Sequence, residues 1–240
     1  MKVIVSESYE ELSQKAADLF ISILQEKPQS KLGLATGSSP IGLYKNLIKA
    51  QKEGEISFHW AKTINLDEYV GISPENEQSY QYFMNENLFN HVNIKKENTH
   101  LPKADTNDEK YAEEYNKLLD DFGTRDLQVL GLGPNGHLAF NEPGEFLNKR
   151  TSIVKLADAT IEANSRFFES KDDVPKYAIS MGMADAFNAK TLIVVASGKN
   201  KKDVVKKLIE GKEISPSFPA SFLSLHPNCY LFVDKEAMGE

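Results

Sequence analysis

Short apolar runs alternate along this chain with longer segments in which apolar residues recur every three or four positions. The runs are typical of buried strands, and the periodic segments are typical of amphipathic helices. The runs predict strands at residues 2–5, 31–35, 63–66, 127–132, 191–196 and 229–233. The periodic segments predict helices at residues 8–25, 40 to about 54, 79–88, 108–122 and 218–225, and a further helix that ends at 209.

The order of these elements predicts the fold class. Strands alternate with helices throughout, which is typical of a mostly parallel sheet with helices packed against it. Because no internal repeat, low-complexity tract or linker divides the chain, we expect one α/β domain over residues 1–240. Residues 98–107 are predicted to be a connecting loop. Residues 146–158 lack a clear period and fit either a mobile lid or a covering strand.

Composition and charge narrow the classes of partner. The 28 Lys and Arg residues are outnumbered by 35 Asp and Glu residues, and the net charge of −7 argues against a general nucleic-acid or anionic membrane surface. The single cysteine, Cys229, lies in an apolar strand pattern, which fits core packing and a reducing compartment. Since the chain shows neither a signal-peptide pattern nor an apolar stretch of roughly 18 residues, we expect a cytoplasmic protein.

A glycine turn after the second predicted strand is a candidate phosphate-binding site. The segment T-G-S-S-P, residues 36–40, leads from that strand into a helix. Backbone N–H groups and the positive end of the dipole face one point at a helix start, and Ser38 and Ser39 add hydroxyl donors. The alternative is an ordinary helix start with Pro40 in the first turn.

A second glycine turn follows the apolar strand at residues 191–196. Gly198 precedes Lys199 and Lys201 at a helix start, where the helix dipole alone disfavours positive charge. This local conflict favours an anionic ligand nearby, and the alternative is a solvated basic helix end. Arg166 carries an always-charged planar group that suits a phosphate or carboxylate, although most arginines form surface or structural ion pairs.

Candidate acid–base groups follow two of the predicted strands. Asp67 comes directly after the third strand, where open α/β sheets bind ligands and where partial burial raises a carboxyl pKa toward that of a working base. The alternative is a helix-cap or turn acid. The fourth apolar run ends in a glycine-rich turn that carries Asn135, His137 and Glu142. A carboxylate five residues after a histidine can orient it, and the alternative is a satisfied loop histidine.

Five motifs in this chain together resemble the glucosamine-6-phosphate deaminase family. They occur in the family's order and span most of the chain, and their combination is far more specific than any one of them. The motifs are G-L-A-T-G-S-S-P (33–40), N-L-D-E-Y-V-G (65–71), G-x-N-G-H-L-A-F-N-E-P (133–143), N-S-R-F-F (164–168) and G-K-N-K (198–201).

The resemblance implies a Rossmann-like three-layer α/β sandwich with a mostly parallel central sheet. It also implies a hydrolase of amino-sugar catabolism that converts glucosamine 6-phosphate and water to fructose 6-phosphate and ammonia, with neither cofactor nor metal ion. Asp67 would take the C2 proton, and His137, assisted by Glu142 and Asn135, would open the pyranose ring. The residues that would hold the 6-phosphate are Gly37, Ser38, Ser39, Arg166 and Lys201.

Two departures from the family pattern carry further expectations. Several members have aspartate where this chain has Asn135, so Glu142 is expected to do more of the orienting of His137. Members activated by N-acetylglucosamine 6-phosphate have basic residues at the positions that align with Ser152 and Val154. We therefore expect a non-allosteric monomer that binds a small-molecule substrate and neither nucleic acid nor membrane.

Two other functions compete on the same fold. A 6-phosphogluconolactonase shares the fold and a similar N-G-H turn, but the motifs F-N-E-P and N-L-D-E-Y-V-G favour the deaminase. A non-catalytic sugar-phosphate sensor would keep the phosphate-binding residues alone. The retained Asp67, His137 and Glu142 argue against a sensor, as does the lack of an appended DNA-binding module or a basic face.

Overall fold

Seven strands form the central sheet, in the order β1-β10-β9-β6-β2-β3-β5, and each neighbouring pair is parallel. The computed structural model describes residues 1–157, 160–162, 165, 168, 170 and 173–240. The strands of this sheet are β1 (Lys2–Ser6), β2 (Lys31–Leu34), β3 (Lys62–Asn65), β5 (Thr99–His100), β6 (Leu127–Gly131), β9 (Leu192–Ala196) and β10 (Cys229–Asp234).

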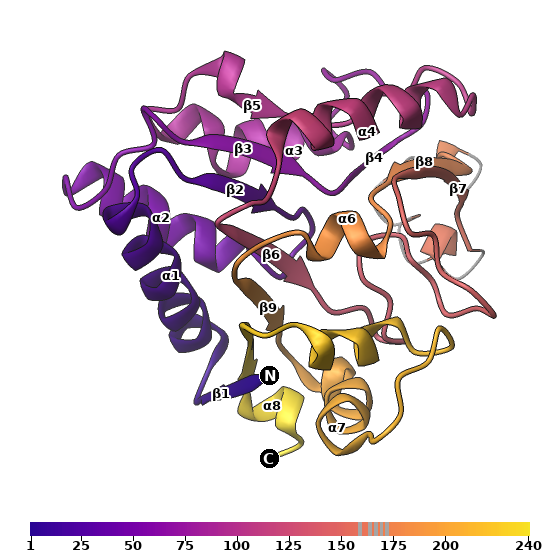
Figure 1. Ribbon diagram of the computed structural model, residues 1–240. Helices are drawn as coiled ribbons and strands as arrows, with labels where there is room; N and C mark the ends of the chain where they lie inside the picture. The colour runs from indigo at the N-terminus through magenta and orange to yellow at the C-terminus, as the bar shows by residue number, and fades with distance from the viewer. Residues whose placement is uncertain (158–159, 163–164, 166–167, 169, 171–172) are drawn as a thin grey trace.

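Helices cover both faces of this sheet, with α1 and α2 on one side and α6 and α7 on the other (Figure 1). This arrangement confirms the predicted three-layer α/β sandwich with its mostly parallel sheet. The α-helices are α1 (Tyr9–Glu26), α2 (Ile41–Lys52), α3 (Tyr80–Asn87), α4 (Lys110–Phe122), α6 (Met183–Phe187), α7 (Lys202–Glu210) and α8 (Lys235–Met238). Short 3-10 helices span Phe89–His91, Lys96–Asn98, Lys199–Lys201 and Pro219–Leu225.

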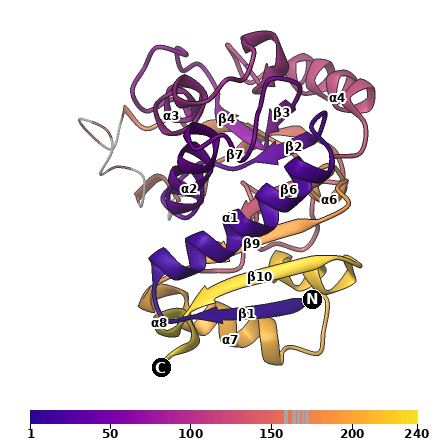
Figure 2. The ribbon, with the colours of Figure 1, turned by 90° about the vertical axis from the view of Figure 1, so that its left-hand side faces the viewer.

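The apolar patterning explains these layers. All five residues of β9 are buried, as expected for a strand covered by helices on both faces. Helix α1 begins where the Ser8 side chain accepts the N–H of Glu11, and it buries one apolar face against the sheet. The Glu11 carboxylate accepts the N–H of Glu7, one residue before Ser8, whose N–H a capping box would use. Figure 2 shows α1 running beside α2 across the sheet.

A second, antiparallel sheet lies beside the first and was not predicted. Its strands, in the order β4-β8-β7, are β4 (Asp67–Tyr69), β8 (Tyr177–Ser180) and β7 (Ser152–Lys155). The chain passes from β3 into β4 through the single residue Leu66, so Asp67 lies within a strand and not in a loop after one. Strand β7 falls within residues 146–158, where a covering strand was one of the two alternatives.

Other differences from the sequence-based expectations concern short elements. Residues 98–107 contain β5, so the prediction of a plain loop there is wrong, because a strand of two residues shows no alternation. The five-residue α6 and the four-residue α8 are too short for a helical period to be visible. The predicted helix at 218–225 is a 3-10 helix. Within the residues described, no helix combines the length and the apolar character that a membrane span requires.

Candidate active site

The carboxyl ends of the parallel strands bring three candidate segments together. Strand β2 ends before the turn at residues 36–40, β6 ends before the loop that carries the candidate histidine, and β9 ends before Gly198. A Cβ atom added at Gly131 would lie 3.9 Å from the Oγ of Ser39. The Nζ of Lys201 donates to the carbonyl of Leu132 at 2.6 Å. The phosphate-binding candidates therefore adjoin the end of β6.

His137 is held in one tautomer by Asn135 and Glu142. The Nδ2 of Asn135 donates to Oε2 of Glu142 at 2.7 Å, which leaves the Asn135 Oδ1 as an acceptor. That oxygen accepts from the backbone N–H of His137 at 3.1 Å and lies 2.7 Å from the His137 Nδ1. The proton of a neutral imidazole therefore lies on Nδ1, and Nε2 keeps a free lone pair. Such a nitrogen can take a proton from one oxygen and deliver it to another.

Two glycines fix the loop that carries this imidazole. A Cβ atom at Gly133 would lie 2.4 Å from the His137 ring, so the ring packs directly on backbone that any other residue would obstruct. Gly136 has a φ of +91°, and a Cβ atom there would lie 2.3 Å from the ring of Phe218. The Gly133 N–H also donates to the carbonyl of His137 at 3.0 Å, which closes the turn.

Glu142 is an ionised carboxylate surrounded by donors. Besides the Asn135 amide, it accepts the hydroxyl of Thr160 at 2.8 Å, and its Oε1 lies 3.5 Å from the His137 Nδ1. Partial burial alone would raise its pKa, but the interactions with His137, Asn135 and Thr160 outweigh burial and lower the pKa of Glu142 to about 2. The side chain therefore stays negative throughout the neutral range.

Asp67 is in the opposite electrostatic situation. It is only 7% exposed, and burial, followed by the charge of neighbouring Glu68, raises the pKa of Asp67 to about 8. Glu68 is also buried, but its carboxylate accepts the N–H groups of Tyr69, Tyr80 and Gln81 at 2.9, 3.0 and 2.9 Å. Burial raises the pKa of Glu68 too, against the effect of these three donors. Asp67 is therefore suited to exchange protons near neutral pH.

Strand β8 joins the segment of Asp67 to the loop that carries His137. Asp67 pairs with Ser180 of β8, and the Ser180 Oγ accepts the N–H of Phe140 at 3.2 Å. One residue further along each segment, the Nδ2 of Asn141 donates to the carbonyl of Met181 at 2.8 Å. Strand β8 and the residue after it therefore bond both the segment of the candidate base and the loop of the imidazole.

The turn at residues 36–40 is open to a ligand. Gly37 has a φ of +87°, and a Cβ atom added there would meet no atom within 4 Å. Lys201 is part-buried, and burial lowers its pKa from the ordinary value. Its hydrogen bond goes to a neutral carbonyl, and none of the ion pairs formed between described residues involves it. A partly buried ammonium group without a carboxylate partner favours an anionic ligand.

One predicted site residue, Arg166, lies outside the described residues.

Three residues that contact the site were not singled out from the sequence. Nothing in the sequence pointed to the Thr160 contact, because no motif or spacing links a threonine to a glutamate 18 residues earlier. Glu68 was visible beside Asp67, but its contacts with the start of α3 were not. Tyr9, which contacts the turn at residues 36–40, continues the apolar face of α1 and was indistinguishable from a core residue.

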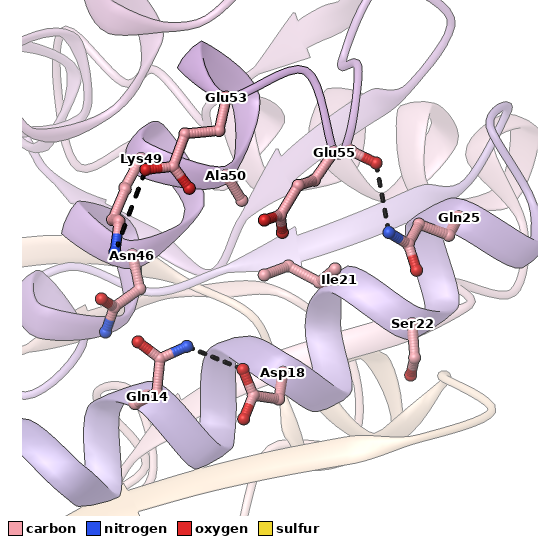
Figure 3. Close-up of a pocket in the computed structure, with 10 residues that line it drawn as sticks. All are labelled: Gln14, Asp18, Ile21, Ser22, Gln25, Asn46, Lys49, Ala50, Glu53 and Glu55. Atoms are coloured by element: carbon pink, nitrogen blue, oxygen red, sulfur yellow. Dashed lines mark hydrogen bonds and ion pairs between the residues drawn. The ribbon is translucent and has the colours of Figure 1, made fainter.

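A groove between α1 and α2 lies away from this site (Figure 3). It has a volume of about 310 Å³, and polar side chains that bond one another line much of it, such as Gln14 to Asp18 at 2.7 Å. The groove extends toward the C-terminal ends of both helices, whereas the turn at residues 36–40 lies at their N-terminal ends.

Among the described residues, no cluster of three or more His, Cys, Asp or Glu side chains is placed to hold a metal ion.

Comparison with known families places the chain in context. The family model described as glucosamine-6-phosphate isomerases/6-phosphogluconolactonase matches residues 6–230. A glucosamine-6-phosphate deaminase of Thermoanaerobacter pseudethanolicus is 48% identical over 238 residues, 99% of this chain and 94% of the relative. A protein of the same name from Lachnoclostridium phytofermentans is 50% identical over 229 residues, 95% of this chain and 97% of the relative.

Solved structures give the same picture of the fold. A monomeric glucosamine-6-phosphate deaminase superposes with a TM-score of 0.95 at 42% identity, covering 100% of this chain and 99% of that one. A 6-phosphogluconolactonase of Trypanosoma brucei superposes with a TM-score of 0.78 at 19% identity, covering 99% of this chain and 97% of that one. The second likeness concerns the fold alone.

Proposed function

The chain belongs to the family of glucosamine-6-phosphate isomerases and 6-phosphogluconolactonases, and on this premise we propose that it converts glucosamine 6-phosphate and water to fructose 6-phosphate and ammonia. Identities of 48% and 50% to full-length deaminases support this substrate, whereas the likeness to a lactonase is limited to the fold at 19% identity. Because water is consumed and ammonia leaves, we describe the reaction as an aldose–ketose isomerisation coupled to hydrolytic deamination.

The observation that carries the proposal is that two differently tuned proton-transfer groups lie on segments that both bond to strand β8. The C2 proton of the sugar is weakly acidic until the ring is open and C1 is a carbonyl carbon. The enzyme therefore needs one group that opens the ring and a separate base for C2. His137 with its free Nε2, and Asp67 with a pKa of about 8, supply these two groups.

His137 opens the pyranose ring in this mechanism. Its Nε2 takes the proton of the anomeric hydroxyl and delivers a proton to the ring oxygen, which breaks the bond between C1 and that oxygen. The imidazolium that forms between these two steps is stabilised by Glu142, whose negative charge lies 3.5 Å from the Nδ1. Asn135 bonds both Glu142 and the imidazole of His137, and its Oδ1 keeps the proton on Nδ1.

Asp67 acts on the open-chain sugar. Its carboxylate removes the proton from C2, the electron pair forms a C1=C2 double bond, and the C1 oxygen takes a proton from the C2 ammonium group, which gives an enolamine. A proton then returns to C1, and the nitrogen lone pair forms an imine at C2. Water adds to that imine, and the C–N bond breaks to give the ketone and ammonia. The buried setting of Asp67 keeps its basicity high enough for the first of these steps.

The 6-phosphate is held at a distance from the reacting carbons. We assign this role to Gly37, Ser38 and Ser39 of the turn, to Lys201, and to Arg166. The open side of Gly37 supports the assignment, as does the charge of Lys201, which forms no ion pair with another described residue. Binding energy from the phosphate positions C1 and C2 against the two proton-transfer groups.

The remaining features of the proposal concern the whole protein. We propose that residues 1–240 form one domain that acts as a monomer in the cytoplasm, and a monomeric deaminase at 42% identity supports the oligomeric state. The positions that align with basic residues in allosteric members are Ser152 and Val154 of β7, so we propose that N-acetylglucosamine 6-phosphate does not activate the enzyme.

The test of this function is product formation. Purified protein is given glucosamine 6-phosphate, and ammonia and fructose 6-phosphate are measured together, with 6-phosphogluconolactone as a parallel substrate. We expect stoichiometric release of both products and a hyperbolic rate curve that N-acetylglucosamine 6-phosphate leaves unchanged. Hydrolysis of the lactone alone, or binding of sugar phosphate without turnover, would contradict the proposal.

A further inference from the structure

The hydroxyl of Tyr9, the first residue of α1, contacts both the turn that leads into α2 and the start of α2 itself. Its oxygen lies 3.0 Å from the carbonyl oxygen of Ser38 and 3.0 Å from that of Ser39. It also accepts the backbone N–H of Gly42 at 2.8 Å. One half-buried side chain from another helix therefore bonds the last residues of the turn and the first turn of α2 at once.

These contacts fill a gap in the capping of α2. Most helices begin at a Ser, Thr, Asp or Asn whose side chain accepts an N–H of the first turn. The N-cap of α2 is Pro40, which makes no such side-chain bond. The N–H of Gly42, the second residue of α2, is the group that such a side chain would accept, and Tyr9 accepts it from outside the helix.

The same contacts set the direction of the backbone in the turn. Because the peptide between Ser38 and Ser39 is trans, its N–H points opposite to its carbonyl. The carbonyls of Ser38 and Ser39 are directed toward the Tyr9 hydroxyl, so the N–H of Ser39 points to the other side. That orientation presents a donor to an anion and turns the negative ends of the peptide groups away from it.

The close approach of α1 and α2 makes this bond achievable. A Cβ atom added at Gly42 would lie 2.2 Å from the Oγ of Ser13 and 3.1 Å from the Tyr9 Cε1. Only glycine at this position lets the two helices come near enough for the Tyr9 hydroxyl to reach the N–H. Figures 1 and 2 both show α1 and α2 side by side.

We propose that Tyr9 is a positioning residue for the substrate phosphate: it caps α2 from outside and holds the 37–39 turn with the N–H of Ser39 facing the ligand. This inference rests on the proposed function, because it takes the turn to be the 6-phosphate site. Tyr9 touches no reacting atom, so it affects how tightly the phosphate is held and leaves the chemical step alone.

The direct test is Tyr9→Phe, which keeps the ring and removes only the hydroxyl. We expect the KM for glucosamine 6-phosphate to rise roughly 3- to 10-fold while kcat stays within about twofold. The variant loses the hydrogen bond that caps α2, which is a bond between neutral groups away from the reacting carbons. The dissociation constant of inorganic phosphate, measured by calorimetry on the same protein, should rise by a similar factor.

Two variants serve as matched controls. Tyr230→Phe also removes a tyrosine hydroxyl, which accepts from the Lys2 Nζ at 3.2 Å on the distant edge of the sheet. Gln25→Ala removes a bond between α1 and the segment that follows α2, at the other end of the two helices, where the Gln25 Nε2 donates to the carbonyl of Glu55 at 3.1 Å (Figure 3). Both controls should leave the KM and the phosphate affinity unchanged.

The outcomes separate this inference from the proposed function. An unchanged KM and phosphate affinity in Tyr9→Phe would overturn the inference, as would an equal rise in Gln25→Ala, which would point to helix packing in general. If the wild-type protein did not turn over glucosamine 6-phosphate, the proposed function would fail. The phosphate calorimetry would still decide whether Tyr9 holds an anion-binding turn.

Discussion

Two carboxylates of the proposed site, Asp67 and Glu142, have pKa values shifted in opposite directions. The pKa of Asp67 is raised to about 8, and that of Glu142 is lowered to about 2. Asp67 is buried and Glu142 is part-buried, and burial raises the pKa of both, so burial does not account for the low pKa of Glu142. The difference lies in their partners, because Glu142 is bonded by an amide and a hydroxyl and lies beside an imidazole, whereas Asp67 has another acid as its neighbour.

This comparison shows how one site can hold both a proton acceptor and a permanent anion. The donors around Glu142 come from its own loop and from Thr160, and they fix a negative charge beside His137. The three N–H groups near Asp67 are taken by Glu68, which leaves Asp67 beside a second carboxylate. We therefore propose that the hydrogen-bond donors around each carboxylate decide whether it acts as a base or stays a permanent anion.

The largest effect is expected for Asp67→Asn, which removes the base and keeps the shape of the side chain. Turnover of glucosamine 6-phosphate should fall by roughly 10³-fold or more, because a neutral amide cannot accept the C2 proton. The affinity for inorganic phosphate, measured by calorimetry, should stay within twofold. A variant that retains wild-type turnover would remove Asp67 from the mechanism.

A smaller loss is expected for Glu142→Gln. The amide keeps hydrogen-bonding capacity but cannot stabilise the imidazolium of His137, so kcat/KM should fall by roughly 10²-fold. Steady-state rates of the variant test this, and Asn135→Asp is the control, since it places a negative charge beside the same Nδ1 of His137. Activity equal to wild type in Glu142→Gln would show that the charge is not needed for ring opening.

Glu68→Gln should move the pH profile with less change in the maximum rate. The acid limb of kcat/KM reports the ionisation of Asp67 in the free enzyme and should lie near pH 8 in the wild type. Removing the neighbouring charge lowers the pKa of Asp67, so the limb should move down by roughly one pH unit. A limb at an unchanged pH would mean that burial alone sets the basicity of Asp67.

The smallest effects concern stability, and they have opposite signs. Asp67, with an ordinary pKa of 3.8, binds more protons in the folded state between pH 4 and pH 8, so the free energy of unfolding falls as pH rises through that window. Glu142, ordinarily 4.5, stabilises the fold above that pH and loses this contribution as pH falls toward 2.

At pH 8, Asp67→Asn should therefore be more stable than wild type by about 1–3 kcal/mol, and Glu142→Gln less stable by about 1–2 kcal/mol. Urea denaturation at pH 5 and pH 8 measures both changes. The gain in Asp67→Asn should shrink at pH 5, where the wild-type carboxyl is already protonated in the folded state. An equal gain at both pH values would contradict the account of Asp67.

The long elements of the fold were predictable because each contains several residues that follow the same apolar pattern. The buried run of β9 and the apolar face of α1 each carry several residues of the same pattern. The second sheet was missed because β4 has three residues and β7 and β8 have four each, too few to separate alternation from chance.

The candidate site residues could be named from motifs, and their roles stay predictions. Asp67, His137 and Glu142 stand in short segments whose residue types suit proton transfer. The raised pKa of Asp67 was expected, and the adjacent Glu68 was visible in the sequence, but the burial of Asp67 within a second sheet was not predicted. The roles of Thr160 and Tyr9 likewise arise from contacts between segments 18 and about 30 residues apart.

The central claim, that Asp67 and not Glu142 takes the C2 proton, is tested most directly with glucosamine 6-phosphate deuterated at C2. Loss of the label to water is followed by NMR for the wild type, Asp67→Asn and Glu142→Gln. We expect the wild type to release the label, Glu142→Gln to release it more slowly, and Asp67→Asn to retain it. Release of the label by Asp67→Asn at the wild-type rate would contradict the account.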